Sequence, residues 1–349
     1  MNTIKIEGHK IGNSHPPFII AEAGINHNGD LDKAFKMIEI AKKSGATAIK
    51  FQTFNAEDLV ADPNLTYSYT SQGKNITESM LEMFKRYQFS REQWFQIKEK
   101  CDQENIVFLS SPSSKTDFKL LLDLGVKAIK VGSDDFTSIP LIKEYSTAGL
   151  PLILSCGMSN LKEIKETINS LTEFNHNPII LLLCTSEYPT PPENVNLLKF
   201  NTIHDEFKIP LGFSDHTQGS LASSLAVSVG ACVFEKHFTL DNNLPGPDHW
   251  FSEDPEGLRN WINNIKKSYM MLGNGVVEPT NDEQKMKKLA RKSIVALTDI
   301  KKNEIIDSQK IGLKRPGDGL PPKMFDEIIG KITTRDLMKN ELLKSGDYL

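Results

Sequence analysis

Two histidines follow neighbouring apolar segments of this sequence, at positions from which they could share one metal ion. His216 lies three residues after the apolar run 209–213, and His237 lies three residues after the run 231–234. A helical stretch, residues 218–229, separates these runs, so both histidines are expected at the same edge of a parallel sheet. Imidazole suits divalent first-row metals. The pair therefore predicts a metal site, although a single histidine in such a loop is more commonly structural.

Charged residues end three further apolar runs: Glu22, Lys50 and Lys130. A carboxylate at the end of a barrel strand faces the mouth of the barrel, where Glu22 would act as a general acid or base. A lysine inside a barrel is costly unless it is paired, which favours a functional role for Lys50 and Lys130. Gln52 alternates to the same side of its strand as Lys50 and is expected to face the same mouth.

Hydroxyl side chains recur at the ends of the other runs. They are Ser111, Ser133, Ser155, Ser186 and Ser214. A single serine after a strand is as often a helix cap as a ligand, but lysines, hydroxyls and loop amides together predict a site for a phosphate or a carboxylate. Paired lysines are also typical of a Schiff-base aldolase. Such an enzyme needs no metal, so the histidine pair argues against it.

Further polar residues follow the expected strands without a pattern that assigns them a role by itself. Asp135 and Tyr188 come after the fourth and sixth runs. Asp248, in a Pro-Gly-Pro-Asp-His segment after the eighth run, would bind a substrate hydroxyl, support the histidines or belong to a plain turn. Arg315 lies on a Pro-Gly turn near the C-terminus, where most arginines are simply solvated.

Eight short apolar runs must position these side chains, and amphipathic helical stretches separate them. The runs are 18–22, 48–52, 106–110, 128–131, 152–155, 179–184, 209–213 and 231–234. Runs of this kind suit strands that are buried on both faces of a parallel sheet. Eight strand–helix units in about 270 residues favour a closed (β/α)8 TIM barrel over an open doubly wound sheet. Residues 57–89 form a long insertion, which is either a binding loop or surface decoration.

Composition is that of an ordinary globular protein. Of the 349 residues, 39% are hydrophobic and 25% are charged, and the net charge of −4 argues against binding to nucleic acid or a membrane surface. No apolar run reaches the roughly 18–20 residues of a membrane span, and the N-terminal residues have no signal-peptide core. The four cysteines form no Cys-x-x-Cys pair and are interpreted as reduced thiols, which favours a cytoplasmic protein.

The last part of the chain has a different character from the rest. The expected division is a barrel over 1–280, a polar linker over 281–290 and a small β-rich domain over 291–349. The segments 299–306 and 336–343 are near-repeats, each with a Lys-Asn-Glu turn followed by an apolar pair. This repetition predicts a pseudo-symmetric domain, with chance similarity as the alternative.

The ordered motifs of the chain resemble those of the sialic acid synthase family, which includes N-acetylneuraminate, legionaminic acid and pseudaminic acid synthases. The motifs are AEAGINHNG (21–29), KFQT (50–53), GM (157–158), CTSEYPT (184–190), GFSDHT (212–217), EKHFT (235–239), GPDH (246–249) and KRPG (314–317). The resemblance runs almost end to end, and the tail resembles the SAF (antifreeze-like) domain of these enzymes.

The resemblance implies a condensation of phosphoenolpyruvate with an open-chain N-acetylated hexose, which yields a nine-carbon 2-keto-3-deoxy sugar acid and phosphate by C–O cleavage. It implies that His216 and His237 hold Mn2+ or Mg2+ and that Glu22 and Asp135 take part in catalysis. The implied phosphoenolpyruvate ligands are Lys50, Ser111, Lys130, Ser133, Ser155, Ser186 and Ser214. Gln52, Tyr188 and Asp248 would position the sugar, together with Arg315 from the partner in a domain-swapped homodimer.

Three positions depart from the common pattern of that family. Asp135 stands where a longer Glu is common, Cys156 where Thr is common, and Ser186 where Asn is frequent. Together with an unusual insertion at residues 74–82, they leave two acceptors open: N-acetylmannosamine and a 2,4-diacetamido-trideoxyhexose. A Schiff-base aldolase and an inactive glycan-binding protein are the alternatives to the synthase.

Overall fold

The computed structural model describes residues 3–349, which form two compact units. The first unit ends at Gly273 and the second begins at Asn274. In the described part of the chain, no helix is both long enough and apolar enough to cross a membrane.

Eight parallel strands form the centre of the first unit. They are β3 (Phe18–Gly24), β4 (Ala48–Thr53), β7 (Val107–Pro112), β8 (Ile129–Val131), β9 (Leu152–Ser155), β10 (Ile179–Cys184), β11 (Leu211–Ser214) and β12 (Ala231–His237). Neighbours in the chain are neighbours in the sheet, and β12 pairs with β3. β7 and β8, at the two ends of the hydrogen-bonded order, also lie beside each other, so the sheet closes. The predicted TIM barrel is confirmed.

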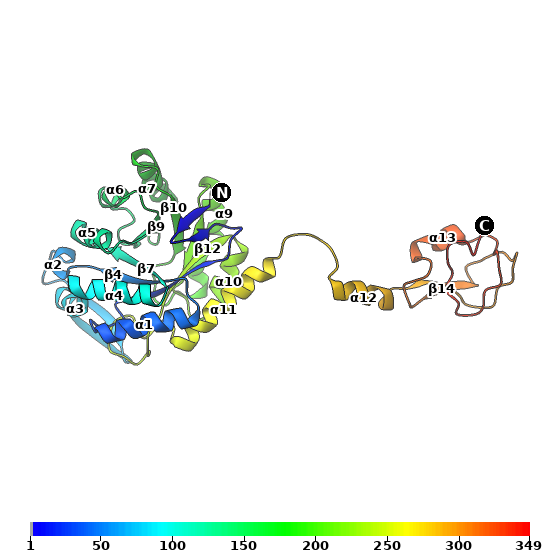
Figure 1. Cartoon of the computed structure of the whole chain (residues 1–349), viewed down its shortest axis with the longest axis horizontal. Coiled ribbons are helices and arrows are strands. Elements are labelled where there is room, and N and C mark those ends of the chain that lie inside the picture. The colour runs from blue at the N-terminus through cyan, green and yellow to red at the C-terminus, as the bar shows by residue number, and fades with distance from the viewer. Residues whose placement is uncertain (1–2) are drawn as a thin grey trace. The chain divides into compact units, whose positions relative to one another are not determined.

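Helices lie around the outside of the barrel strands (Figure 1). They are α1 (Leu31–Ser44), α4 (Arg91–Gln103), α5 (Lys115–Asp123), α6 (Ile139–Ser146), α7 (Leu161–Phe174), the short α8 (Pro192–Val195), α9 (Lys199–Glu206), α10 (Leu221–Ser228) and α11 (Pro255–Leu272). The caps of α1 are typical: the Asp30 side chain accepts a hydrogen bond from Lys33 N, and Gly45 ends the helix at a φ of 90°. These caps fix the residues at which α1 begins and ends, and so the lengths of the loops that connect it to β3 and β4.

Strand alternation decides which side chains enter the barrel. Even-numbered Phe18 and Ile20 of β3 pack inside, whereas Ile19 and Ala21 face the helices. Glu22 continues the inward series at the C-terminal end of β3. An N-terminal hairpin, β1 (Ile4–Ile6) and β2 (His9–Ile11), contributes Ile4, Ile6 and Ile11 to this inner core and fills the barrel at its N-terminal end.

The insertion after β4 has secondary structure of its own. It contains α2 (Ala56–Leu59), a hairpin of β5 (Thr66–Ser71) and β6 (Lys74–Ser79), and α3 (Met80–Tyr87). The tip of the hairpin is tied to the loop after β12. Gln72 Nε2 donates to the carbonyl of Asn243 (2.9 Å), and Ser71 Oγ accepts from Gly246 N (3.1 Å). The insertion is therefore fastened beside the barrel mouth.

The second unit begins with a helix where the sequence predicted a linker. This helix, α12 (Asn281–Ala290), has a capping box at Thr280 and buries none of its side chains. It is followed by the antiparallel pair β13 (Ser293–Ala296) and β14 (Ile311–Lys314), by the 3-10 turn η1 (Pro322–Met324) and by α13 (Phe325–Ile328). A small core of aliphatic side chains lies within the unit, including Ile294, Ile300 and Leu337.

The near-repeats of the tail are equivalent in structure. Asn303 and Asn340, one in each turn, both have positive φ, at 66° and 70°. The contacts between the copies are reciprocal: Lys302 N donates to Asp336 Oδ1, and Lys339 N donates to Asp299 Oδ1, both at 2.8 Å. Ile300 and Leu337 exchange two backbone hydrogen bonds of 2.8 Å. The unit therefore has internal pseudo-two-fold symmetry, as the repetition predicted.

Candidate active site

Four charged side chains meet inside the barrel near its C-terminal mouth. Lys50 Nζ lies 2.8 Å from Glu22 Oε2 and 3.9 Å from Glu235 Oε2. Lys130 Nζ lies 3.8 Å from Glu235 Oε1. All four residues are buried. Two ammoniums and two carboxylates thus form one chain of charges, with Glu235 between the lysines.

Burial and mutual charge shift the pKa values of these groups. Burial raises the pKa of Glu22 to about 7, although the Lys50 ammonium opposes the shift. Burial lowers the pKa of Lys130, and the nearby Lys50 adds to this effect. Burial alone would raise the pKa of Glu235, but Lys130 and Lys50 outweigh it and hold the pKa low. Of the two carboxyls in this chain of charges, Glu22 is therefore the one that can exchange a proton near neutrality.

Hydroxyl groups surround the two lysines. Lys130 Nζ donates to Ser155 Oγ (2.7 Å), and Lys50 Nζ donates to Ser111 Oγ (3.4 Å). Ser214 Oγ donates to Glu235 Oε1 (3.1 Å). Cations and hydroxyls from five strands, β4, β7, β8, β9 and β11, thus share one interior, an arrangement that can hold an anion.

Ser133 and Ser186 lie beside this cluster at Gly157. Gly157 N donates to Ser133 Oγ (3.0 Å), and Ser133 Oγ also contacts the sulfur of Cys184 (3.0 Å). A Cβ atom at Gly157 would lie 2.5 Å from Ser186 Oγ and 2.8 Å from Ser133 Oγ, so only glycine fits there. Ser186 also lines a cavity of about 550 Å³ on the side of α7 and α9.

The two histidines lie next to each other at the mouth. The ring centroids of His216 and His237 are 5.7 Å apart, and Tyr188 stacks 4.2 Å from the first. His216 Nδ1 is 2.7 Å from the carbonyl of Thr185, so Nδ1 donates and Nε2 keeps its lone pair. His237 Nδ1 is buried without a hydrogen-bond partner. Burial lowers the pKa of both rings, so both are neutral at pH 7.

These features fit a divalent metal ion. A ligating histidine typically donates its second ring nitrogen to a backbone carbonyl, as His216 does to Thr185. Among residues 3–349, no group of three or more His, Cys, Asp or Glu side chains is arranged to hold an ion. The chain would therefore provide two ligands, and the remaining coordination positions would fall to substrate and water.

A cavity of about 480 Å³ opens beside His237 and extends under the β5–β6 hairpin. Gln52, Tyr188 and Asp248 line it, as does His237. Its other walls are mostly aromatic or apolar: Ile25, Tyr67, Tyr69, Met80, Met83, Phe84, Pro247, Trp250 and Phe251. Burial raises the pKa of Asp248 to about 7, so this carboxyl can accept or donate a hydrogen bond. The three residues expected to position a sugar therefore face one cavity.

Two predicted residues are placed differently from the others. Asp135 is partly buried, and the contact that affects its carboxyl is with Ser138. Burial lowers the pKa of Lys50, but the charges of Glu22, of Glu235 and, least of all, of the exposed Asp134 outweigh it and raise this pKa. Arg315 lies in the second unit, exposed after β14.

The sequence analysis assigned no role to Glu235, although this residue contacts both lysines. A signal was present, because Glu235 stands two residues before His237 and shares its inward face. The expected run ended at residue 234, however, whereas β12 continues to His237 through its pairing with β3. Glu235 was therefore missed because the strand was expected to end one residue before it, and not because of its residue type.

Comparison with known proteins agrees with the fold. The chain matches the model of the NeuB family over residues 37–277 and that of the SAF domain over residues 291–348. An N,N'-diacetyllegionaminic acid synthase of Legionella pneumophila is 39% identical over 95% of this chain and 95% of that protein. One from Campylobacter jejuni is 40% identical over 93% of this chain and 98% of that protein.

Solved structures give the same result. The crystal structure of an N-acetylneuraminic acid synthetase from Leptospira borgpetersenii superposes with a TM-score of 0.73 at 33% identity. The match covers 82% of this chain and 95% of that one. The chain is therefore a member of the NeuB, or sialic acid synthase, family with a C-terminal SAF domain.

Proposed function

We propose that this protein condenses phosphoenolpyruvate with an open-chain N-acylated hexose to give a nine-carbon 2-keto-3-deoxy sugar acid and phosphate. The observation that carries the proposal is the buried group of Lys50 and Lys130 with their serines, which is connected to the histidine pair through Glu22, the register partner of both Lys50 and His237. An anion bound there would lie next to an aldehyde held at the mouth. Membership of the synthase family supports the same reaction.

Phosphoenolpyruvate would bind at the lysines through its phosphate and carboxylate. Lys50 and Lys130 supply the positive charge, and Ser111, Ser155 and Ser214 supply hydroxyl donors. Ser133 and Ser186, which lie around Gly157, would complete this shell. The carboxylate of Glu235, between the two ammoniums, keeps both protonated until an anion is bound.

The reaction balances without a covalent intermediate on the protein. The C3 carbon of phosphoenolpyruvate forms a bond to the aldehyde carbon, whose oxygen takes the proton of the Glu22 carboxyl. Water attacks the cationic C2, and the Glu22 carboxylate takes up the proton that this water releases. The bond between C2 and the bridging oxygen then breaks, the C2 hydroxyl passes its proton to the departing phosphate, and the ketone forms.

His216 and His237 would hold Mn2+ or Mg2+, with substrate and water as the other ligands. When bound, such an ion polarises the acceptor aldehyde as a Lewis acid. The chain itself keeps both rings neutral by burial and fixes His216 through the carbonyl of Thr185. Tyr188 packs against the His216 ring and limits its rotation.

The acceptor is best explained as a 2,4-diacetamido-trideoxyhexose rather than N-acetylmannosamine. The walls of the cavity at Asp248 are rich in aromatic and methionine side chains, which suit acetamido methyls and a deoxygenated C6. Within residues 3–349, no lysine or arginine lines this cavity, so a phosphorylated sugar would find no countercharge there. The two legionaminic acid synthases at 39% and 40% identity support this choice.

The assembly proposed here is a cytoplasmic, domain-swapped homodimer. The described cysteines are all unpaired and buried, as suits a reducing compartment that also contains phosphoenolpyruvate. Arg315, exposed on its turn, would reach the acceptor from the partner subunit's second unit.

Phosphate release from a panel of N-acyl sugars tests the reaction and the acceptor together. We expect release with the diacetamido-trideoxyhexose and slower release with N-acetylmannosamine. Phosphoenolpyruvate that carries 18O at the bridging position should give labelled phosphate. Label retained in the keto acid would contradict C–O cleavage, and a preference for N-acetylmannosamine would contradict the acceptor.

A Schiff-base aldolase is the second candidate, because burial lowers the pKa of Lys130 as it does for amine nucleophiles. Incubation with pyruvate and borohydride distinguishes the two reactions. We expect no covalent adduct, since Lys130 Nζ is engaged by Ser155 and by the carbonyl of Val131. An adduct at Lys130, together with no phosphate release, would favour the aldolase.

A further inference from the structure

A second buried ion pair lies behind the histidines, on the outer face of β11 and β12. Lys236 Nζ is 3.2 Å from Asp215 Oδ2 and 3.8 Å from Glu253 Oε1, and it donates to the carbonyl of Thr217. Asp215 and Lys236 are 1% and 3% exposed, so neither charge is screened by solvent. Neither residue contacts the lysine–serine cluster in the barrel interior. The role of Asp215 and Lys236 therefore depends on the segments that their ion pair connects.

Each member of the pair directly precedes one of the histidines. Asp215 comes before His216, and Lys236 comes before His237. Because side chains alternate along β12, Lys236 points outward where His237 points inward, and Asp215, just after the end of β11, lies against Lys236. Asp215 N also donates to the carbonyl of Glu235 (2.8 Å), which sets the two segments side by side. The ion pair of Asp215 and Lys236 and the two histidine rings thus lie on opposite faces of the same two segments.

Support from the outer face matters because β11 ends before its histidine. The last residue of β11 is Ser214, so no strand pairing fixes His216. The Asp215 side chain supplies the missing bonds: Oδ1 accepts from Thr217 N (2.9 Å) and Thr217 Oγ1 (2.7 Å). On the other oxygen, Oδ2 accepts from Ser223 Oγ (2.5 Å).

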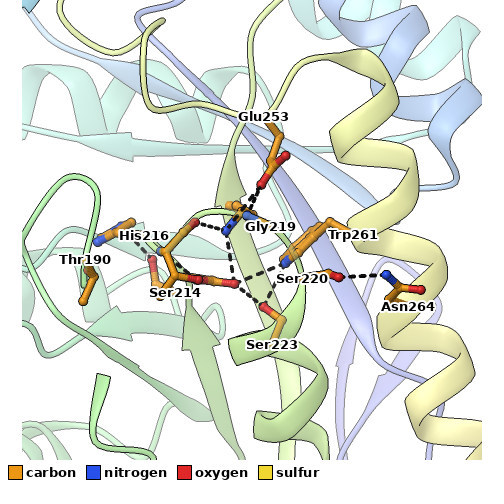
Figure 2. Close-up of polar contacts among 12 residues, drawn as sticks. Thr190, Ser214, His216, Gly219, Ser220, Ser223, Glu253, Trp261 and Asn264 are labelled. Atoms are coloured by element: carbon orange, nitrogen blue, oxygen red, sulfur yellow. Dashed lines mark hydrogen bonds and ion pairs between the residues drawn. The ribbon is translucent and has the colours of Figure 1, made fainter. Parts of the chain in front are cut away.

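Two helices complete this support. Trp261 Nε1 of α11 donates to Ser223 Oγ of α10 (2.8 Å), and Glu253 accepts from Gly219 N (2.9 Å). Figure 2 shows Ser223 and Trp261 on the side of the loop away from the His216 ring. The loop that carries His216 is therefore fixed from behind to α10, α11 and β12.

We propose that Asp215 and Lys236 are positioning residues, whose ion pair sets the separation and orientation of the His216 and His237 rings for metal binding. The inference rests on the proposed function, because it takes the two rings as metal ligands. It assigns no contact with substrate to either residue. Loss of the pair would let the loop after β11 move relative to β12 and would separate the two rings.

Metal affinity measured without substrate tests this role. The Mn2+ dissociation constant is measured by electron paramagnetic resonance for the wild type, Asp215→Ala, Lys236→Met and the double variant Asp215→Ala/Lys236→Met. We expect each variant to bind Mn2+ about 10–100-fold more weakly, the range found when groups that support metal ligands are removed. Thermal unfolding of each protein is recorded in parallel.

The double variant distinguishes an effect on the position of the histidine rings from an effect on the stability of the fold. Asp215→Ala leaves Lys236 with only the more distant Glu253, and Lys236→Met leaves the buried Asp215 without a cation, so both single variants lose stability, whereas the double variant removes both charges of the pair. We expect its melting temperature to recover partly while its Mn2+ affinity stays low. Recovery of affinity together with melting temperature would show that the pair acts on stability alone and would overturn the proposal.

Two control variants test whether a loss of Mn2+ affinity is specific to Asp215 and Lys236. Glu253→Gln keeps an acceptor for Gly219 N and lies in the same network, and Ile142→Ala creates a cavity in α6, away from the histidines. We expect both to keep wild-type Mn2+ affinity, the second despite a lower melting temperature. An equal loss of affinity in either control would contradict the specific role of the pair.

Amide hydrogen exchange in the metal-free protein distinguishes this inference from the proposed function. We expect faster exchange across residues 214–220 in Asp215→Ala than in the wild type. If the wild type fails to bind Mn2+, the metal of the proposed reaction is wrong. If exchange in Asp215→Ala is unchanged, the positioning role itself is wrong.

Discussion

Glu22 and Lys50 are register partners on neighbouring strands β3 and β4, and their charged groups lie 2.8 Å apart inside the barrel. Glu22 is 1% exposed and Lys50 is 4% exposed. Glu22 is proposed to take the proton that water releases, and Lys50 is proposed to bind phosphoenolpyruvate. The ion pair therefore connects the proposed base to the proposed anion site. An anion that draws Lys50 away from Glu22 would change the proton affinity of Glu22 at the moment of substrate binding.

Substitution of each partner should therefore affect different kinetic constants. Glu22→Gln should lower kcat by about 10²–10⁴-fold, the usual contribution of a general base, with little change in KM for phosphoenolpyruvate. Lys50→Met should mainly raise that KM, because a cation of the anion site is lost. Steady-state phosphate release measures both constants. Lys98→Met, which removes a surface ion pair with Asp102, is the control and should leave both unchanged.

Removal of metal should abolish activity reversibly. We expect EDTA to stop phosphate release and Mn2+ or Mg2+ to restore it, because the ion would polarise the acceptor aldehyde. His216→Ala or His237→Ala should cost at least about 10²–10³-fold in rate. The exposed His176→Ala is the matched control and should be fully active. Undiminished activity in chelator would remove the metal from the mechanism.

Asp135 should make folding stability depend on pH. Burial and the neighbouring Asp134 raise its pKa from 3.8 to about 6. As the pH rises from 3.8 to about 6, the unfolded chain releases this proton before the folded protein does. The contribution of Asp135 to the free energy of unfolding is therefore greatest below this window and is lost across it.

The variant Asp135→Asn should remove this pH dependence. Urea unfolding from pH 4 to pH 7 should show a smaller fall in stability for the variant than for the wild type. Phosphate release by the variant should stay near the wild-type rate, since Asp135 contacts Ser138 rather than the lysines. A large loss of activity at unchanged stability would instead return Asp135 to the reaction.

Arg315 should complete an active site in the partner subunit. We expect Arg315→Ala to be nearly inactive yet still dimeric, because its guanidinium would bind the acceptor in a fixed fork. Co-expression with His237→Ala gives mixed dimers in which one barrel has both histidines and receives an intact arginine from the other chain. Such dimers should regain activity.

The control for this experiment is Lys323→Ala, an exposed cation of the same unit, which should be active alone. If mixed dimers form but stay inactive, Arg315 serves its own barrel and the domain-swapped arrangement is wrong.

Sequence pattern was sufficient to predict the barrel and most of the charged cluster. Glu22, Lys50 and His237 are found by periodicity, because alternation along a buried strand leaves little choice of face. The sequence pattern does not predict which side chains from distant segments come into contact. The bridge from Glu235 to both lysines depends on how far β12 extends, and extension depends on pairing with β3. The orientation of Asp134 and Asp135 depends on a short turn, which has no period.

The filled N-terminal end of the barrel has a consequence for the order of events in the proposed reaction. Ile4, Ile6 and Ile11 close that end, so every molecule must enter and leave through the mouth that the histidines border. The lysines are buried in the barrel interior and do not line the proposed acceptor cavity, which opens at His237 and Asp248. In the proposed reaction, phosphoenolpyruvate would therefore bind before the sugar, and phosphate would leave after the sugar acid.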